Sequence, residues 1–230
     1  MASSPFTIGL LLFPNLTQLD LTGPWEVFAR MPNVKNYLIW KDRQPVMSDR
    51  GMAIVPTATF ADCPQLDLIC IPGGPGQIAL MDDDETLDFV RRMAQNAQWV
   101  TSVCTGSLVL GAAGLLQGYR ATSHWGSLDQ LSLLGATPVA ERVVRDRNRI
   151  TGAGVTSGID FALTVAQELF GREVAENIQL QMEYDPAPPF HSGSPRSASP
   201  ARLAEAKNQM QDFIARRRLA TEQAAARLKR

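Results

Sequence analysis

Short apolar runs alternate with helical patterns between residues 6 and 170, and this alternation limits the fold more than any other feature. Brief apolar runs that end at turn residues predict four buried strands, Phe6–Phe13, Tyr37–Trp40, Asp67–Ile71 and Trp99–Val103. Helical spacing predicts helices at Pro24–Arg30, Glu85–Asn96, Thr105–Leu116 and Ile159–Phe170. Strands that alternate with helices predict an α/β protein with a mostly parallel sheet, covered on both faces.

The chain continues past this alternating region with two further segments. Pro186–Pro200 is rich in proline and serine and excludes a regular helix or a central strand. Ala201–Arg230 has apolar residues at helical spacing and predicts one long amphipathic helix. We therefore expect an α/β domain over residues 1–190, followed over residues 191–230 by a linker and a helix packed on the domain or on a dimer partner. Met47–Val55 is expected to form a small hairpin.

Charge and hydropathy argue against nucleic-acid and membrane partners. The formal net charge is −1, so no general attraction to DNA or to an anionic membrane is expected. The basic cluster Arg216–Arg218 lies in a helical segment, where such charges usually form a solvated face. The longest apolar run, Ile8–Phe13, is too short to span a bilayer, and residues 1–5 lack the features of a signal peptide. The expected compartment is the cytoplasm.

Cysteine and histidine are sparse. The cysteines Cys63, Cys70 and Cys104 are widely spaced, and the histidines are His124 and His191. A disulfide framework or a zinc site requires more such residues at closer spacing, so we expect neither, and no structural metal. Cys70 lies in a buried-looking strand and Cys63 in a loop, and both are expected to be core or bystander residues.

Residues capable of chemistry follow three of the predicted strands. Asp20 stands before a Gly-Pro pair, Gly73 and Gly74 form a glycine turn after Asp67–Ile71, and Cys104 follows Trp99–Val103. In open α/β sheets, sites form beyond the carboxyl ends of the strands. The three segments are therefore expected to meet at one edge of the sheet.

Cys104 lies where a strand must reverse sharply into a helix. A residue at such an elbow is often held in a sparsely allowed backbone conformation, with its side chain projecting into a cleft. Gly106 removes a side chain where the first helical turn would crowd the strand. The free N–H groups and the dipole of the helix start favour a thiolate, so the pKa of Cys104 is expected to be lowered. The alternative is a small buried apolar residue, and the local sequence leaves both interpretations open.

Asp20 and His124 each have two interpretations as well. Asp20 could cap a helix that begins near Thr22 to Pro24, or could carry protons beside a thiol. His124 could orient a thiolate, or could simply be half-buried next to Trp125. Spacing alone decides neither case.

Several motifs together resemble the ThiJ/PfpI superfamily, which is related to the class-I glutamine amidotransferases. They are QLDLTGP (18–24), DLICIPGG (67–74), TSVCTGSLVLGAAGLLQG (101–118), ATSHW (121–125), ERVVRD (141–146), GIDFAL (158–163) and EYDPAPPF (183–190). Within the superfamily the chain is most similar to the isocyanide (isonitrile) hydratase branch. The match extends over nearly the whole chain.

The resemblance implies a flavodoxin-like three-layer sandwich with a C-terminal helical extension, and a homodimer. It implies Cys104 as a nucleophile on a strained elbow, with the Asp20 carboxyl hydrogen-bonded near the sulfur. The Gly74 N–H and the helix start at Thr105 would be oxyanion donors. Gly73, Gly106 and His124 would lie next to these residues and help to position them. A small isocyanide is the implied substrate, and no metal or organic cofactor is implied.

Departures from other branches narrow the expected chemistry. Thr105 occupies the position where the peptidase-like branch has histidine, and Asp20 stands where the glyoxalase and stress-protein branch has glutamate. Only 40 residues follow Phe190, too few for the DNA-binding module of the regulator branch. We expect hydration of an isocyanide to an N-substituted formamide through a thioimidate on Cys104. Asp20 would act as general acid and base, and Thr105 would orient the carboxylate or the water. The alternatives are a glyoxalase-like carbonyl enzyme and a non-enzymatic redox sensor.

Overall fold

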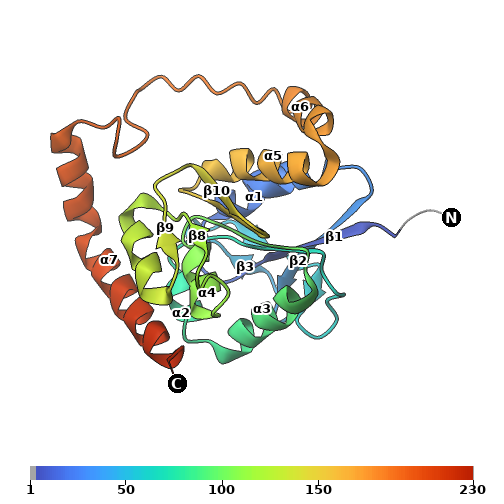
Figure 1. The fold of residues 1–230 in the computed structure, drawn as a ribbon, viewed down its shortest axis with the longest axis horizontal. Coiled ribbons are helices and arrows are strands. Elements are labelled where there is room, and N and C mark those ends of the chain that lie inside the picture. Colours follow the sequence, from blue (N-terminus) through green and yellow to red (C-terminus); the bar gives the residue numbers. More distant parts are fainter. Residues whose placement is uncertain (1–3, 230) are drawn as a thin grey trace.

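A seven-stranded sheet forms the centre of the computed structural model, which describes residues 4–229 (Figure 1). Its strand order is β10-β11-β7-β6-β1-β2-β5, and β10 and β11 form its antiparallel pair. The strands are β1 (Phe6–Leu11), β2 (Val34–Trp40), β5 (Ala58–Thr59), β6 (Leu68–Ile71), β7 (Trp99–Val103), β10 (Val143–Asp146) and β11 (Arg149–Gly152). The predicted α/β class with a mostly parallel sheet is confirmed.

Helices cover both faces of this sheet. They are α1 (Gln18–Phe28), α2 (Gln77–Leu80), α3 (Asp84–Asn96), α4 (Gly106–Ala112), the 3-10 helix η1 (Trp125–Leu134), α5 (Ser157–Phe170), α6 (Arg172–Gln181) and α7 (Pro200–Arg227). α1 and α5 pack together on one face, and α3 and α4 lie on the other (Figure 1). This three-layer arrangement buries most of β1, β6 and β7 on both faces, in agreement with their mainly apolar sequences.

Two short strand pairs lie outside the main sheet. β3 (Val46–Met47) and β4 (Ala53–Ile54) form the hairpin predicted at Met47–Val55. β8 (Arg120–Ala121) and β9 (Thr137–Pro138) pair in parallel beside the β10 edge of the main sheet. The hairpin lies against the loop that follows β1, because Asn15 N donates to Met47 O and Asp49 N donates to Leu16 O.

The start of α1 differs from the prediction. The helix begins at Gln18, and Pro24 lies inside it rather than at its start. The residue before the helix, Thr17, donates its N–H to the Gly73 carbonyl across the sheet edge. A tertiary hydrogen bond therefore positions the helix start, and local sequence signals do not contain it.

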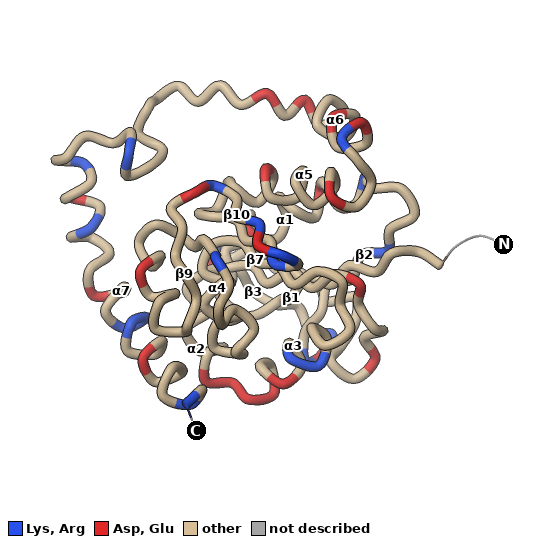
Figure 2. The backbone as a smooth tube through the Cα atoms, in the orientation of Figure 1, with Lys and Arg blue, Asp and Glu red and all other residues tan. Residues whose placement is uncertain are grey.

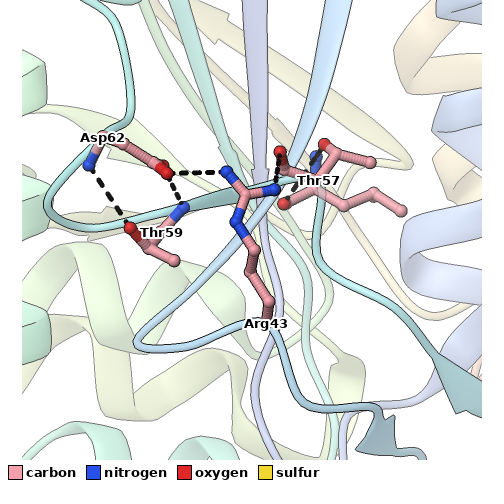
Figure 3. A network of polar contacts seen from close by, with 5 residues as sticks. Arg43, Thr57, Thr59 and Asp62 are labelled. Atoms are coloured by element: carbon pink, nitrogen blue, oxygen red, sulfur yellow. Dashed lines mark hydrogen bonds and ion pairs between the residues drawn. The ribbon is translucent and has the colours of Figure 1, made fainter.

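Polar contacts organise the end of the sheet at β5 (Figure 3). Asp62 accepts a hydrogen bond from the Thr59 N–H and forms an ion pair with Arg43. The Arg43 guanidinium also donates to the Thr57 carbonyl. β5 is the last strand at this end of the sheet, and these exposed polar groups cover its edge. The opposite edge, β10 with β11, was not predicted, because the sequences VVRD and RITG are short and contain charged residues rather than an apolar run.

The C-terminal part of the chain begins with a long irregular segment. Residues 186–199 contain no helix or strand, as predicted, and they run from α6 to α7 across the outside of the molecule (Figure 1). Ser199 caps α7 by accepting the Arg202 N–H, and Pro200 follows at the first helical position. The second half of α7 packs on η1, α2 and α4 through Arg217, Thr221, Ala224 and Ala225.

Charged residues lie mainly on the outer helices and loops, and α3, α6 and α7 carry charges of both signs (Figure 2). Within residues 4–229, no helix is both long and apolar enough to cross a membrane. The same residues contain no cluster of three or more His, Cys, Asp or Glu side chains that could hold a metal ion.

Candidate active site

Three loops meet at the carboxyl edge of the sheet. β7, β6 and β1 are neighbours in the sheet, and the chain leaves them toward Cys104, Gly73 and Asp20 respectively. The closeness of these residues is measured at Gly73. A Cβ built there would lie 2.8 Å from Asp20 Oδ2, 2.8 Å from Cys104 Cβ and 2.6 Å from Thr105 N. The three segments singled out in the sequence therefore form one site.

Cys104 occupies a strained elbow between β7 and α4. Its φ is 55°, in the left-handed region that side-chain-bearing residues rarely adopt. Its N–H donates to the carbonyls of Gly152 (3.0 Å) and Ala153 (2.8 Å). Its carbonyl accepts hydrogen bonds from two hydroxyls, Ser107 Oγ and Ser123 Oγ, each at 3.1 Å. Four hydrogen bonds thus hold the predicted elbow in place, and the side chain is only 6% exposed.

Glycine is required where α4 starts. A Cβ at Gly106 would lie 2.0 Å from the Ile71 carbonyl oxygen, which no rearrangement of a side chain could relieve. The absence of that Cβ lets α4 begin directly against the end of β6. Gly106 therefore sets the position of the Cys104 elbow relative to the glycine turn.

Asp20 points into the site from the first turn of α1. It is fully buried, and its Oδ2 accepts the Gly73 N–H at 3.1 Å. The same oxygen lies next to the Cys104 side chain at the Gly73 position, and Asp20 Oδ1 has no hydrogen-bond partner within residues 4–229. The helix already begins at Gln18, so Asp20 is not the helix cap that one interpretation of the sequence allowed. A buried carboxyl facing a thiol is suited to proton transfer.

The pKa values of this pair follow from burial. Burial raises the pKa of Asp20 from 3.8 to about 7, against the lowering effects of the neighbouring Cys104 thiol and of the hydrogen bond from the Gly73 N–H. Burial and the negative charge of Asp20 also raise the pKa of Cys104 well above its usual value. The Thr105 N–H and the Arg217 charge act in the lowering direction. The prediction that the pKa of Cys104 is lowered was wrong. Burial beside a carboxylate raises the pKa of this thiol by more than the start of the helix lowers it.

Asp20→Asn is expected to stabilise the protein at neutral and higher pH. The folded protein holds the Asp20 proton more tightly than the unfolded chain, so stability decreases as pH rises from about 4 through about 7. A pKa difference of about 3 corresponds to about 4 kcal/mol, and an unpaired amide N–H would offset part of it. Chemical unfolding at pH 8 should show a gain of about 1–3 kcal/mol in the free energy of unfolding.

The pH dependence provides the check on that gain. The difference between Asp20→Asn and the native protein should shrink as pH falls from about 7 toward 4, because the native carboxyl then becomes neutral. A difference that stays constant over this range would contradict the raised pKa of Asp20.

Thr105 links the elbow to the glycine turn. Its Oγ1 accepts the Gly74 N–H at 3.1 Å, and its own N–H acts to lower the pKa of the Cys104 thiol. The Gly74 N–H, expected to serve as an oxyanion donor, is therefore directed at Thr105 instead. The Thr105 hydroxyl keeps its proton free to donate, because the oxygen acts as acceptor in the contact with Gly74.

His124 lies close behind the elbow, at the start of η1. Its Nδ1 accepts the Gly126 N–H at 3.2 Å, and its ring packs against Gly154. Burial and the nearby Arg217 charge lower its pKa to about 4, so the imidazole is neutral at physiological pH. His124 therefore contributes no positive charge to the thiol.

The sequence did not single out Arg217, which the structure places next to this site. The side chain is 5% exposed, whereas the Arg216–Arg218 cluster was expected to form a solvated face. Its Nε donates to Gln77 Oε1 and its Nη1 to Ser127 Oγ, both at 2.9 Å. On α7, Arg217 shares one helical face with the buried residues Thr221 and Ala224. This shared face is the signal in the sequence that could have indicated its burial.

Gly73→Ala is expected to damage the site selectively. The added methyl would overlap Thr105 N, Asp20 Oδ2 and Cys104 Cβ, all three of which belong to the site. Overpacking of this kind costs about 1–3 kcal/mol of stability, and displacement of the reacting groups should remove activity. Gly193→Ala is the matched control, because a Cβ at Gly193 meets nothing within 4 Å. Thermal unfolding and a turnover assay of both variants check this.

The other two cysteines lie in unreactive surroundings. Burial raises the pKa of Cys63 to about 11 and that of Cys70 to about 12. Cys70 lies inside β6, and Cys63 is half-buried after β5. Both therefore remain neutral thiols at physiological pH.

This fold and this site define a class of protein. The model of the DJ-1/PfpI family matches residues 7–168, and the chain belongs to that family. The predicted ThiJ/PfpI resemblance is thereby confirmed. The chain is also a homologue of the isonitrile hydratase of Pseudomonas putida, with 58% identity over 96% of this chain and 97% of that protein.

Two further relatives show how the fold is used elsewhere. The crystal structure of a ThiJ/PfpI family protein from Pseudomonas syringae superposes with a TM-score of 0.92 at 46% identity, covering 94% of this chain and 90% of that one. The transcriptional regulator GbdR of Pseudomonas aeruginosa is 29% identical over 79% of this chain but only 52% of its own length. The first relative extends the likeness to α7, which lies beyond the family match at residues 7–168.

Proposed function

We propose that this protein hydrates an isocyanide, R–N≡C, to the N-substituted formamide, with Cys104 as the nucleophile. The observation that carries the proposal is the buried Asp20–Cys104 pair, in which a carboxyl with a pKa of about 7 lies beside a thiol on a strained elbow. The near full-length similarity to an isonitrile hydratase supports the same substrate class.

The first step uses the single proton that Asp20 and Cys104 share. The sulfur donates an electron pair to the terminal carbon of the isocyanide, and a C–S bond forms. Asp20 delivers its proton to the same carbon, which gives the thioimidate R–N=CH–S–Cys104 and leaves Asp20 as a carboxylate. A carboxyl with a pKa near neutrality can give and take a proton at similar cost, which suits it to both steps.

The second step adds water to the same carbon. Asp20 takes one proton from the water as its oxygen bonds to the carbon, and this proton passes to the substrate nitrogen. The remaining hydroxyl proton returns to the Asp20–Cys104 pair as the C=O bond forms and the C–S bond breaks. The product is R–NH–CHO, and the pair again holds one proton. The Thr105 hydroxyl, held by the Gly74 N–H, is the group that orients the water.

The burial of the site limits the shape of the substrate. Cys104 is 6% exposed and Asp20 is fully buried, so a bulky reacting group could not reach the sulfur. The reactive end of an isocyanide is a linear two-atom group whose carbon is terminal. Such a group can approach a nearly buried thiol while the substituent R stays outside. This accessibility favours an isocyanide over a branched carbonyl substrate.

Turnover of an alkyl or aryl isocyanide tests the proposal. The protein should convert the isocyanide to the formamide, detected by chromatography, at a rate proportional to protein concentration. A well-folded preparation that produces no formamide would remove the hydratase and leave the redox-sensor alternative. Light scattering on the same preparation tests the homodimer that we also propose.

A further inference from the structure

Arg217 of α7 is a buried cation whose hydrogen-bond acceptors are neutral. Its guanidinium donates to the amide oxygen of Gln77 and the hydroxyl of Ser127, and it stacks on the Phe213 ring at 4.4 Å. Two other arginines of the same helix differ, since Arg218 pairs with Asp129 and Arg227 pairs with Asp82. Within residues 4–229, Arg217 forms no ion pair with a carboxylate. Buried charges are costly unless a counter-charge compensates them.

Both acceptors of Arg217 belong to segments that hold the Cys104 elbow. The Gln77 N–H donates to the carbonyl of Gly74, whose own N–H holds Thr105. Ser127 belongs to the turn that starts at His124, and the neighbouring Ser123 donates to the Cys104 carbonyl. Gln77 and Ser127 therefore hold the guanidinium on the α4 side of the elbow, whereas Asp20 approaches the elbow from α1.

The charges around the sulfur come from three elements. Asp20 on α1 raises the pKa of Cys104, and Arg217 on α7 lowers it. In return, Cys104 raises the pKa of Arg217, although burial lowers it overall to about 10. His124 is neutral at physiological pH, and Asp49 of the β3–β4 hairpin acts on Asp20. Arg217 thus supplies the positive charge at the sulfur.

We propose that Arg217 is a positioning residue that serves as the counter-charge of the Cys104 thiolate. Its guanidinium draws the proton shared by the pair away from the sulfur and toward Asp20, against the burial and the Asp20 charge that hold it on the sulfur. It thereby favours the forms of the nucleophile and the general acid that the first step needs. The C-terminal helix thereby completes the active site electrostatically. This inference rests on the proposed function for its catalytic consequence only, since the ionisation of Cys104 can be measured without any isocyanide.

The pH dependence of thiol alkylation tests the inference. Alkylation of Cys104 by iodoacetamide should be followed by peptide mapping, which distinguishes the Cys104 adduct from adducts on Cys63 and Cys70. In Arg217→Gln, the midpoint of the rate–pH profile should rise by at least about 1 unit, so alkylation at pH 7 should slow about tenfold. Arg217→Lys should retain most of the native profile, since it keeps the charge.

Arg218→Gln is the matched control, because it removes the adjacent charge of α7, which pairs with exposed Asp129. Its alkylation profile should equal that of the native protein. A folded Arg217→Gln variant with the native profile would overturn the inference. If that variant does not fold, Ser127→Ala replaces it. Losing one anchor of the guanidinium should raise the midpoint by a smaller amount, and an unchanged midpoint there would equally overturn the inference.

A kinetic readout separates electrostatics from damage to the structure. With an isocyanide substrate, Arg217→Gln should lower kcat/KM about tenfold near pH 7 and regain much of it at a pH above the midpoint of its own alkylation profile, where the thiol is ionised. A loss that is equal at both pH values would assign Arg217 a merely structural role. Failure of hydration in the native protein would remove the proposed function but would leave the alkylation test intact.

Discussion

Cys104→Ala is expected to abolish formamide formation while leaving the fold intact. Without the sulfur no thioimidate can form, and removal of a nucleophile lowers kcat by about four orders of magnitude or more. The backbone hydrogen bonds of the elbow do not use the thiol, because Gly152, Ala153, Ser107 and Ser123 all contact the Cys104 main chain. The measurement is kcat for a simple alkyl isocyanide, with thermal unfolding to verify the fold.

Cys63→Ala is the matched control for that experiment. Cys63 is a half-buried thiol far from the elbow in sequence, its Sγ donates to the Pro64 carbonyl, and its loss should leave kcat unchanged. Full activity in a folded Cys104→Ala variant would exclude covalent catalysis. Equal losses in both variants would indicate a general effect on the protein rather than the loss of a nucleophile.

Asp20→Asn is expected to lower kcat/KM by about 10²- to 10⁴-fold, the usual contribution of general acid–base catalysis. The same variant should be more stable than the native protein at pH 8, because it removes a buried carboxylate. A simple structural role for Asp20 would lead to the opposite result, with activity and stability lost together. Measuring kcat/KM and the free energy of unfolding on one preparation distinguishes the two roles.

The pH profile of the native protein gives Asp20 a second test. The reaction needs one proton on the Asp20–Cys104 pair, and the pair takes up a second proton as pH falls through the Asp20 pKa of about 7. The value of kcat/KM should therefore fall toward acidic pH below about 7, and this limb should be absent in Asp20→Asn. A native profile that is flat between pH 5 and 8 would contradict this assignment of the proton.

The sequence predicted the elements of the site better than its electrostatics. Apolar runs and turn residues located β1, β6 and β7, and the carboxyl-edge rule brought Asp20, Gly73 and Cys104 together. The pKa of Cys104 was predicted in the wrong direction, because helix-start effects are local whereas burial and the Asp20 charge depend on tertiary packing.

The burial of Arg217 also depends on tertiary packing, and the local sequence did not predict it. It lies in a run of three arginines, and the neighbours Arg216 and Arg218 are exposed or half-buried while Arg217 is buried. Only the contacts of α7 with α2 and η1 decide which arginine faces the elbow. The start of α1 at Gln18 likewise depends on a hydrogen bond from Thr17 to Gly73, which no local pattern encodes.

The covalent intermediate is the most direct test of the proposed mechanism. Rapid mixing of the native protein with an isocyanide and quenching with acid should trap the thioimidate, whereas Asp20→Asn should form it more slowly, because both steps use the Asp20 carboxyl. Intact-protein mass spectrometry should then show an increase equal to the mass of one isocyanide, and peptide mapping should place it on Cys104. Formamide production by the native protein, with no adduct on Cys104 at any time point in either protein, would contradict the mechanism.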